Sequence, residues 1–121
     1  MASAIDAQLN AMAAEINRKG AKAIDNETTL TNVEARPGKT LVYKYTLAVA
    51  KADMPPGALI QNIRPKLLDA YQHNHEMSFF RDNGVSVIYH YEDKAGEVID
   101  EISIGPKDLS LLRRVASATL G

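Results

Sequence analysis

The three histidines of the chain are the side chains best suited to metal chemistry. His73 and His75 stand two residues apart and Glu76 follows directly, so with His90 they could supply the four ligands of a tetrahedral site. Residues two apart on a helix point about 200° away from each other, so a shared ion would need an extended segment. The alternative is a polar, frayed helix end, where histidine also suits the helix dipole. We favour this alternative and expect no metal and no cofactor.

Carboxylates and serines are frequent in the chain, but they lack the spacing of a catalytic motif. The carboxylates considered for acid–base catalysis are Asp25, Glu27, Asp69, Asp82, Asp100 and Glu101. No serine stands in a Gly-x-Ser-x-Gly elbow, and no glycine-rich loop suited to binding phosphate is present. We therefore expect no enzyme activity. An enzyme whose site is assembled in space stays the third alternative, because a catalytic triad is recognised by its geometry.

Four tyrosines form the strongest candidate for an interaction surface. They alternate along two expected strands, so each pair shares one face of a sheet: Tyr43 and Tyr45, and Tyr89 and Tyr91. If helices cover this face, the rings belong to the core and their hydroxyls reach its rim. If helices cover the opposite face, the rings form an exposed aromatic platform, as is common at protein interfaces. Apolar neighbours on the same strands favour the covered arrangement.

An acidic segment at 92–101 is the second candidate surface. Its carboxylates are Glu92, Asp93, Glu97, Asp100 and Glu101, and Lys94 is the single cation among them. Such runs are most often solvated turns and outer sheet faces, and we favour this explanation. The functional alternative is a negative edge that attracts a basic partner or discourages pairing with another sheet.

Composition narrows the class of protein. The chain has 121 residues, enough for one domain spanning 1–121, and its 45% hydrophobic and 24% charged residues are typical of a folded protein. A net charge of −1 provides no basic surface for nucleic acid. The absence of cysteine excludes disulfides and thiolate metal sites. No apolar run reaches the ~18 residues of a membrane span, and the start of the chain does not have the pattern of a signal peptide.

The periodicity predicts five segments in the order helix, hairpin, helix, hairpin, helix. Ile5, Leu9, Met12 and Ile16 repeat at helical spacing, with a cap at Ser3. Strands at 28–36 and 40–50 flank a turn at 37–39, and strands at 85–92 and 97–104 flank a turn at 93–96. Leu30 and Val33 are out of period by one residue, which indicates a bulge or a late start of the first strand.

The second and third expected helices lie after the two hairpins. The middle helix starts near Asp53 and the prolines that follow it, and runs to about Asn74. Pro65 must kink it or divide it, and we favour a kink. Gly105 and Pro106 begin the last helix, with Leu109, Leu112 and either Val115 or Ala116 facing inward.

The two hairpins resemble a family of small bacterial α+β proteins of unassigned activity, many of them exported. The resemblance rests on residues 25–30, 37–47, 80–85 and 89–91, which read DNETTL, PGKTLVYKYTL, FRDNGV and YHY. It covers about 23–109 of the chain. Many members carry cysteines, which this chain lacks. The resemblance implies an α+β fold and a periplasmic or extracellular location, and it assigns no catalytic residue.

We therefore predict an α+β fold with a four-stranded antiparallel sheet built from two hairpins, and three helices on one face of it (order α-ββ-α-ββ-α). The predicted function is a non-enzymatic protein-binding or structural module of a bacterial exported protein. Its partner would be another protein, or a second copy of this chain in a homodimer, with no nucleic acid and no membrane span. The alternative is a small cytosolic secretion chaperone acting as a dimer, since such chaperones have a similar order of elements.

Overall fold

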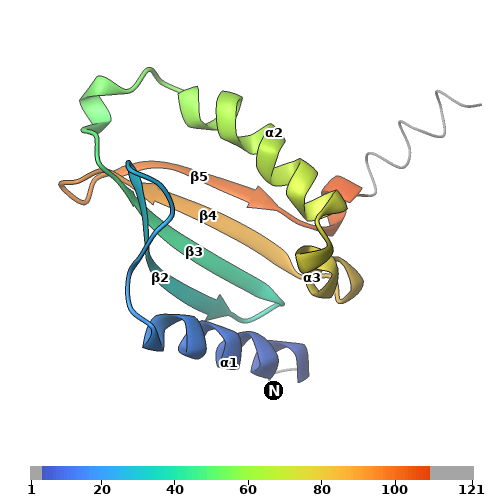
Figure 1. Cartoon of the computed structure of the whole chain (residues 1–121). Helices are drawn as coiled ribbons and strands as arrows, with labels where there is room; N and C mark the ends of the chain where they lie inside the picture. Colours follow the sequence, from blue (N-terminus) through green and yellow to red (C-terminus); the bar gives the residue numbers. More distant parts are fainter. Residues whose placement is uncertain (1–3, 110–121) are drawn as a thin grey trace, which may run out of the picture.

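The computed structural model describes residues 4–109, which form one twisted sheet flanked by helices (Figure 1). The sheet has five strands in the order β1-β2-β3-β4-β5. They are β1 (Lys22–Ala23), β2 (Thr28–Arg36), β3 (Thr40–Leu47), β4 (Ser86–Glu92) and β5 (Val98–Ile104). Neighbouring strands are antiparallel except β3 and β4, which run parallel. The predicted four-stranded antiparallel sheet is therefore wrong in strand number and in the direction of its central pair.

The parallel pair follows from the connection between the two hairpins. After β3 the chain passes through helix α2 (Ala58–His73) before it enters β4. A helix of 16 residues is about 24 Å long, close to the length of an eight-residue strand. It therefore returns the chain to the end of the sheet at which β3 began, and β4 must run in the same direction as β3. Both hairpins were predicted correctly, but this crossover between them was not recognised.

The first helix is confirmed as α1 (Ala4–Arg18), and it ends before Gly20, whose φ is +82°. Leu9 and Ala13 are buried on its inner face, and its other large apolar residues pack partly buried beside them. The predicted cap at Ser3 lies outside the described residues. Asp6, in the first turn, accepts the backbone N–H of Lys39 at 2.8 Å and so ties the start of α1 to the turn between β2 and β3.

Asn17 holds the end of α1 against the free edge of β2. Its Nδ2 donates to the carbonyl of Val33 at 2.7 Å, and its Oδ1 accepts the Val33 N–H at 2.8 Å. β1 pairs only with Leu30 and Thr29, so Val33 has β3 on one side and no strand on the other. The amide of Asn17 thus makes the two hydrogen bonds that another strand would otherwise make.

The predicted bulge in the first hairpin is confirmed between Leu30 and Asn32. Leu30 pairs with Tyr45 and Val33 pairs with Tyr43, so both apolar side chains lie on the face that carries the tyrosines. The extra residue in β2 explains why Leu30 and Val33 stand out of period in the sequence.

The segment between the hairpins holds more elements than predicted. It contains the short 3₁₀ helices η1 (Lys51–Asp53) and η2 (His75–Met77), and a further helix α3 (Ser78–Asp82). α2 begins at Ala58, later than predicted, after Gly57 in the left-handed conformation with φ +77°. It runs undivided through Pro65. Asn74 ends α2, and its side chain accepts the N–H of Glu76 at the start of η2.

Gly105 joins the end of β5 to the beginning of the last helix. A Cβ at this position would lie 2.6 Å from Oγ of Ser86, so only glycine allows the close approach. Residues 106–109 are helical, which makes a fourth helix in addition to α1, α2 and α3. Asp108 accepts the Gly105 N–H at 2.9 Å and pairs with Arg64 of α2 at 3.0 Å. The remainder of the predicted last helix, with Leu112 and Val115 or Ala116, lies outside the described residues.

The core lies on one face of the sheet. The buried apolar residues of the described helices are Leu9, Ala13, Leu59, Tyr71 and Phe80, and all of them belong to one cluster with inward-facing strand residues such as Leu41, Val87 and Ile104. The hydroxyl of Tyr71, which is fully buried, donates to the carbonyl of Val85 at 2.8 Å and so fixes α2 to the start of β4. The helices lie on one face of the sheet, as predicted, but the predicted number of three is wrong, because residues 4–109 contain four α-helices.

Candidate protein-binding face

The four tyrosines come together because of the parallel pairing. Its register sets Tyr43 beside Tyr89 and Tyr45 beside Tyr91. Ring centroids are 5.2 to 6.4 Å apart, and neighbouring ring planes differ by 14° to 19°. Offset stacking at such distances is favourable for aromatic rings. We call these four residues the tyrosine ladder.

The tyrosine ladder lies on the helix-bearing face, along the two central strands. α1 contacts β2 and β3, whereas α2 contacts β5, so the two helices flank the ladder (Figure 1). Tyr89 and Tyr91 are buried, with 7% and 6% of their surface exposed, whereas Tyr43 and Tyr45 are half-buried. The helices thus lie on the face that carries the tyrosines, which is the covered arrangement favoured from the sequence, and Tyr43 and Tyr45 keep part of their surface exposed.

The four hydroxyls of the tyrosine ladder have no hydrogen-bond partner among the described residues. None of them hydrogen-bonds to a residue of the described chain, in contrast to the hydroxyl of Tyr71. Over residues 4–109, the only buried side-chain N or O atom without a hydrogen bond is Nε2 of Gln72, so the ladder hydroxyls are accessible to solvent. The hydroxyls of the half-buried Tyr43 and Tyr45 are therefore the groups of the ladder best placed to donate and accept hydrogen bonds to a partner.

Burial of the rings keeps these hydroxyls protonated. Desolvation raises the pKa of Tyr43, and it raises the pKa of Tyr91 to about 12. Desolvation is also the largest cause of the raised pKa of Tyr45 and Tyr89, and repulsion from the neighbouring phenolates adds to it. The tyrosine ladder is therefore neutral at physiological pH, and the chemistry it offers is hydrogen bonding and apolar contact.

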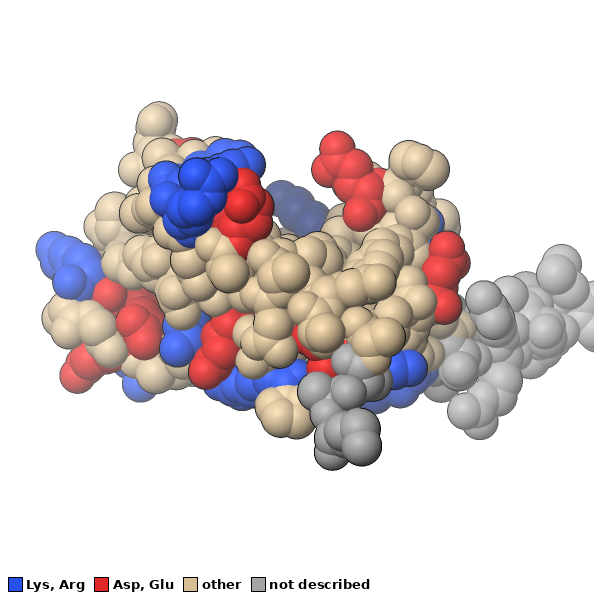
Figure 2. All heavy atoms as spheres, turned by 90° about the horizontal axis from the view of Figure 1, so that it is seen from below, with Lys and Arg blue, Asp and Glu red and all other residues tan. Residues whose placement is uncertain are grey.

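The charges around the molecule carry both signs. Figure 2 shows Lys and Arg side chains and Asp and Glu side chains scattered around a broad area of other residues on the face seen from below. No described helix is long and apolar enough to cross a membrane.

Asp93, one of the predicted acidic surface residues, has its carboxylate turned inward. Only 3% of its surface is exposed. Its Oδ1 accepts the N–H groups of Ala95 and Glu97 at 2.8 and 2.9 Å, and its Oδ2 accepts the N–H of Lys51 at 2.9 Å. These amides, that of Lys51 first, lower the pKa of the Asp93 carboxyl. Asp93 therefore holds the β4–β5 turn against the segment that follows β3.

Glu92 and Glu101 flank His90 on the face opposite the tyrosine ladder. Nδ1 of His90 lies 2.7 Å from a carboxylate oxygen of Glu101, and Nε2 lies 3.1 Å from one of Glu92. Two carboxylates can both accept a hydrogen bond from the ring only when it is an imidazolium, because only that form carries two N–H donors. This cluster was not predicted from the sequence. Glu92 stands two residues after His90 in a strand, and that spacing was the available signal.

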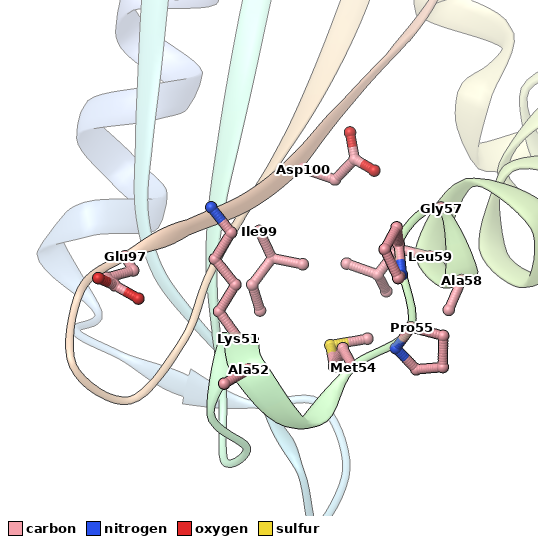
Figure 3. A pocket seen from close by; sticks show the side chains of 11 residues that line it. Lys51, Ala52, Met54, Pro55, Gly57, Ala58, Leu59, Glu97, Ile99 and Asp100 are labelled. Atoms are coloured by element: carbon pink, nitrogen blue, oxygen red, sulfur yellow. The ribbon is translucent and has the colours of Figure 1, made fainter.

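Glu97 and Asp100, the other two predicted acidic residues, line a pocket between β5 and the segment 51–59 (Figure 3). Its volume is about 550 Å³, and Met54, Leu59 and Ile99 supply much of its apolar lining. The sequence does not predict that 51–59 lies beside 97–100, because the two segments are about 40 residues apart in the chain and only the fold brings them together.

The histidines are not brought together. His73 pairs with Asp69 of its own helix at 3.0 Å, His75 lies in η2, and His90 lies in β4. Over residues 4–109 no group of three or more His, Asp or Glu side chains has the arrangement of a metal site.

The sequence matches no known family profile, and no curated protein matches it. Three solved structures share its fold. A candidate secreted protein from Pseudomonas aeruginosa has a TM-score of 0.67 and 14% identity, and the match covers 89% of this chain and 98% of that one.

The other two structures are pilotins of type II secretion systems. AspS from Vibrio cholerae has a TM-score of 0.63 and 10% identity, with 86% of this chain and 91% of that chain covered. EpsS from Vibrio vulnificus has a TM-score of 0.64 and 12% identity, with 86% and 94% covered. At these identities the likeness establishes a common fold over nearly the whole length of all four proteins.

Proposed function

We propose that this protein is a non-enzymatic protein-binding module of a bacterial secretion pathway, and that it binds its partner through the tyrosine ladder. The observation that carries the proposal is the set of four stacked rings, of which Tyr43 and Tyr45 are half-buried, whose hydroxyls have no hydrogen-bond partner among the described residues. Tyrosine is enriched at protein interfaces because its rigid ring buries a large area at a low entropic cost while its hydroxyl hydrogen-bonds.

The fold supports the link with secretion. Two of the structures that share it are type II secretion pilotins and a third is a candidate secreted protein. The predicted family resemblance also implies export. We therefore place the partner among proteins of the secretion pathway, and the protein itself in an extracytoplasmic compartment.

The ladder chemistry supports a binding role over a catalytic one. Raised tyrosine pKa values disfavour the phenolate that nucleophilic or base catalysis would require. Asp93 holds backbone amides, and the imidazoles of His73 and His90 pair with the carboxylates of Asp69, Glu92 and Glu101 away from the ladder.

Site-specific photo-crosslinking in bacterial cells tests the proposal. A benzophenone amino acid replaces Tyr45, which is half-buried in the ladder, and as a matched control replaces Ser103, an exposed residue of β5. We expect the probe at position 45 to crosslink a protein of the secretion pathway, and the probe at position 103 not to do so. Equal crosslinking from both positions, or crosslinking to a second copy of the chain alone, would contradict the proposal.

Hydroxyl deletion measures the contribution of the ladder once the partner is purified. Tyr45→Phe keeps the stacked ring and removes one surface hydroxyl, so we expect a roughly 2- to 10-fold loss of affinity, the value of about one hydrogen bond. Titration calorimetry gives the affinity, and circular dichroism checks that the fold is retained. An unchanged affinity for both Tyr43→Phe and Tyr45→Phe would exclude hydrogen bonding by the exposed end of the ladder.

A further inference from the structure

The pocket beside β5 has an apolar interior built from two distant parts of the chain. Met54 and Leu59 come from the segment leading into α2, and Ile99 comes from β5. Figure 3 shows their side chains extending into the space between this segment and the strand. A volume of about 550 Å³ is within the range of pockets that bind small ligands or anchoring side chains.

The rim of the pocket carries two carboxylates without a cationic partner. Glu97 and Asp100 form no ion pair with a Lys, Arg or His side chain of the described residues, whereas Glu92 and Glu101 nearby both pair with His90. Asp100 uses Oδ1 to accept the N–H of Glu101 at 2.9 Å. Lys51 is the one cation among the described residues that line the pocket, so the rim has an excess of one negative charge.

Exposed apolar side chains also gather at the elements that form this pocket. Ile60 follows Leu59 at the start of α2, and Val98 precedes Ile99 in β5; they are 42% and 48% exposed. Of the large hydrophobic residues in 4–109, Ile24 is the only other one classed as exposed. Each of the two stands next in the chain to a residue that lines the pocket, Leu59 or Ile99.

We infer that this pocket is a docking site for a segment of a partner protein in which an apolar side chain stands next to lysine or arginine. The apolar side chain would enter between Met54, Leu59 and Ile99. The cation would lie at the rim, where Glu97 and Asp100 lack a positive partner. A segment with acidic side chains would be repelled by the carboxylates of Glu97 and Asp100. A purely apolar segment would leave these two carboxylates without a cation.

This site adjoins the Tyr91 end of the tyrosine ladder, because Asp100 pairs with Tyr91 across β4 and β5, and it extends the proposed function by a second contact area of different chemistry. The ladder is neutral and bonds through hydroxyls, whereas the pocket selects by charge. A partner that engaged both would gain affinity from linking two modest contacts.

Fluorescence anisotropy with labelled synthetic peptides tests the inference. The probe is a Gly-Lys-Leu-Lys-Gly peptide, compared with Gly-Lys-Ser-Lys-Gly and Gly-Glu-Leu-Glu-Gly. We expect only the first to bind measurably at low salt, with the affinity falling as salt screens the charges. Amide shifts of the protein in heteronuclear NMR should change at Lys51, Ile99 and Asp100, and stay unchanged at Tyr43 and Tyr45.

Three variants test the charge argument in opposite directions. Asp100→Asn keeps an oxygen that can accept the N–H of Glu101 but removes the charge, and Glu97→Gln removes the second charge. Each should weaken binding of the Lys-Leu-Lys peptide by about two- to fivefold, the value typical of an exposed charge pair. Lys51→Met removes the rim cation and should tighten binding by a similar factor. Its backbone N–H, which bonds to Asp93, is unaffected.

The inference is overturned if the Lys-Leu-Lys peptide does not bind, if the serine or glutamate peptide binds as well, or if the shifts map elsewhere. It is also overturned if Lys51→Met weakens binding as much as Asp100→Asn does. Loss of the ladder crosslinks with peptide binding intact would refute the proposed function alone, and the reverse result would refute this inference alone.

Discussion

Asp93 lies in a turn that the sequence predicts correctly, but its carboxylate has a different role from the one predicted. From the sequence, Asp93 is predicted to lie in a solvated acidic turn and to act as a surface charge. In the structure its carboxylate accepts three backbone N–H groups, one of them from Lys51, 42 residues away in the chain. A carboxylate held by several amides favours its ionised form, which is why its pKa is lowered.

Asp93→Asn should lower the stability of the protein at neutral pH, because an amide NH₂ would face the Lys51 N–H that the carboxylate now accepts. A carboxyl with a lowered pKa stabilises the fold above its unfolded value of about 3.9, and this contribution is lost as the pH falls through the folded value. The difference in urea midpoint between wild type and Asp93→Asn should therefore be large at pH 7 and shrink toward pH 3.

Asp25→Asn provides the matched control for this measurement. The Asp25 carboxylate also accepts two backbone N–H groups and has a lowered pKa, but both amides, of Glu27 and Thr28, belong to its own turn. We expect a smaller loss of stability because no distant segment is held. Equal losses for the two variants would show that Asp93 does not connect the two segments.

Among the elements, α1 depends on Asn17 for its position at the edge of the sheet. Unpaired strand edges invite pairing with other chains, and proteins commonly block them. Here a side-chain amide occupies the edge of β2 at Val33, and the carboxylate of Asp100 accepts an N–H of β5, the opposite edge strand, at Glu101.

Asn17→Ala should lower the free energy of unfolding by roughly 1–3 kcal/mol, since two hydrogen bonds between α1 and β2 are lost. Asn10→Ala on the same helix is the control, because Asn10 bonds only to the carbonyl of Asp6 one turn earlier. Its effect should stay within about 0.5 kcal/mol. Chemical denaturation measures both, and light scattering shows whether the unblocked edge of Asn17→Ala leads to association. Similar stabilities for the two variants would refute the edge-capping role.

At the level of the whole molecule, the tyrosine ladder links the two hairpins across the parallel pair. β3 belongs to the first hairpin and β4 to the second, and their stacked rings form the centre of the helix-bearing face. Ionisation of the buried rings should therefore act on the entire fold.

Raising the pH should unfold the protein cooperatively. The tyrosine pKa values are raised in the folded state, so their contribution to stability is complete below the unfolded value of about 10 and is lost as the pH rises toward about 12, the value for Tyr91. Tyrosinate absorbance and far-ultraviolet circular dichroism should change together in this range. Ionisation of all five tyrosines near pH 10 with the fold intact would contradict the burial of the ladder.

The sequence by itself determined the elements that depend on local chemistry. The first helix, both hairpins with their turns, and the bulge near Leu30 follow from side-chain period and turn residues, which act over a few neighbouring positions. It also identified the four tyrosines, since alternation in a strand is a local property. η2 and α3 were missed because they are only a few residues long, too short to show a period.

Only the tertiary structure decided how these elements meet. The parallel direction of β3 and β4 comes from the return path through α2, and the ladder comes from the register of that pair. The contacts of Asp93 and His90 and the pocket beside β5 join residues 11 to more than 40 positions apart. Such contacts depend on where the sheet places each strand, and no spacing along the chain encodes that placement.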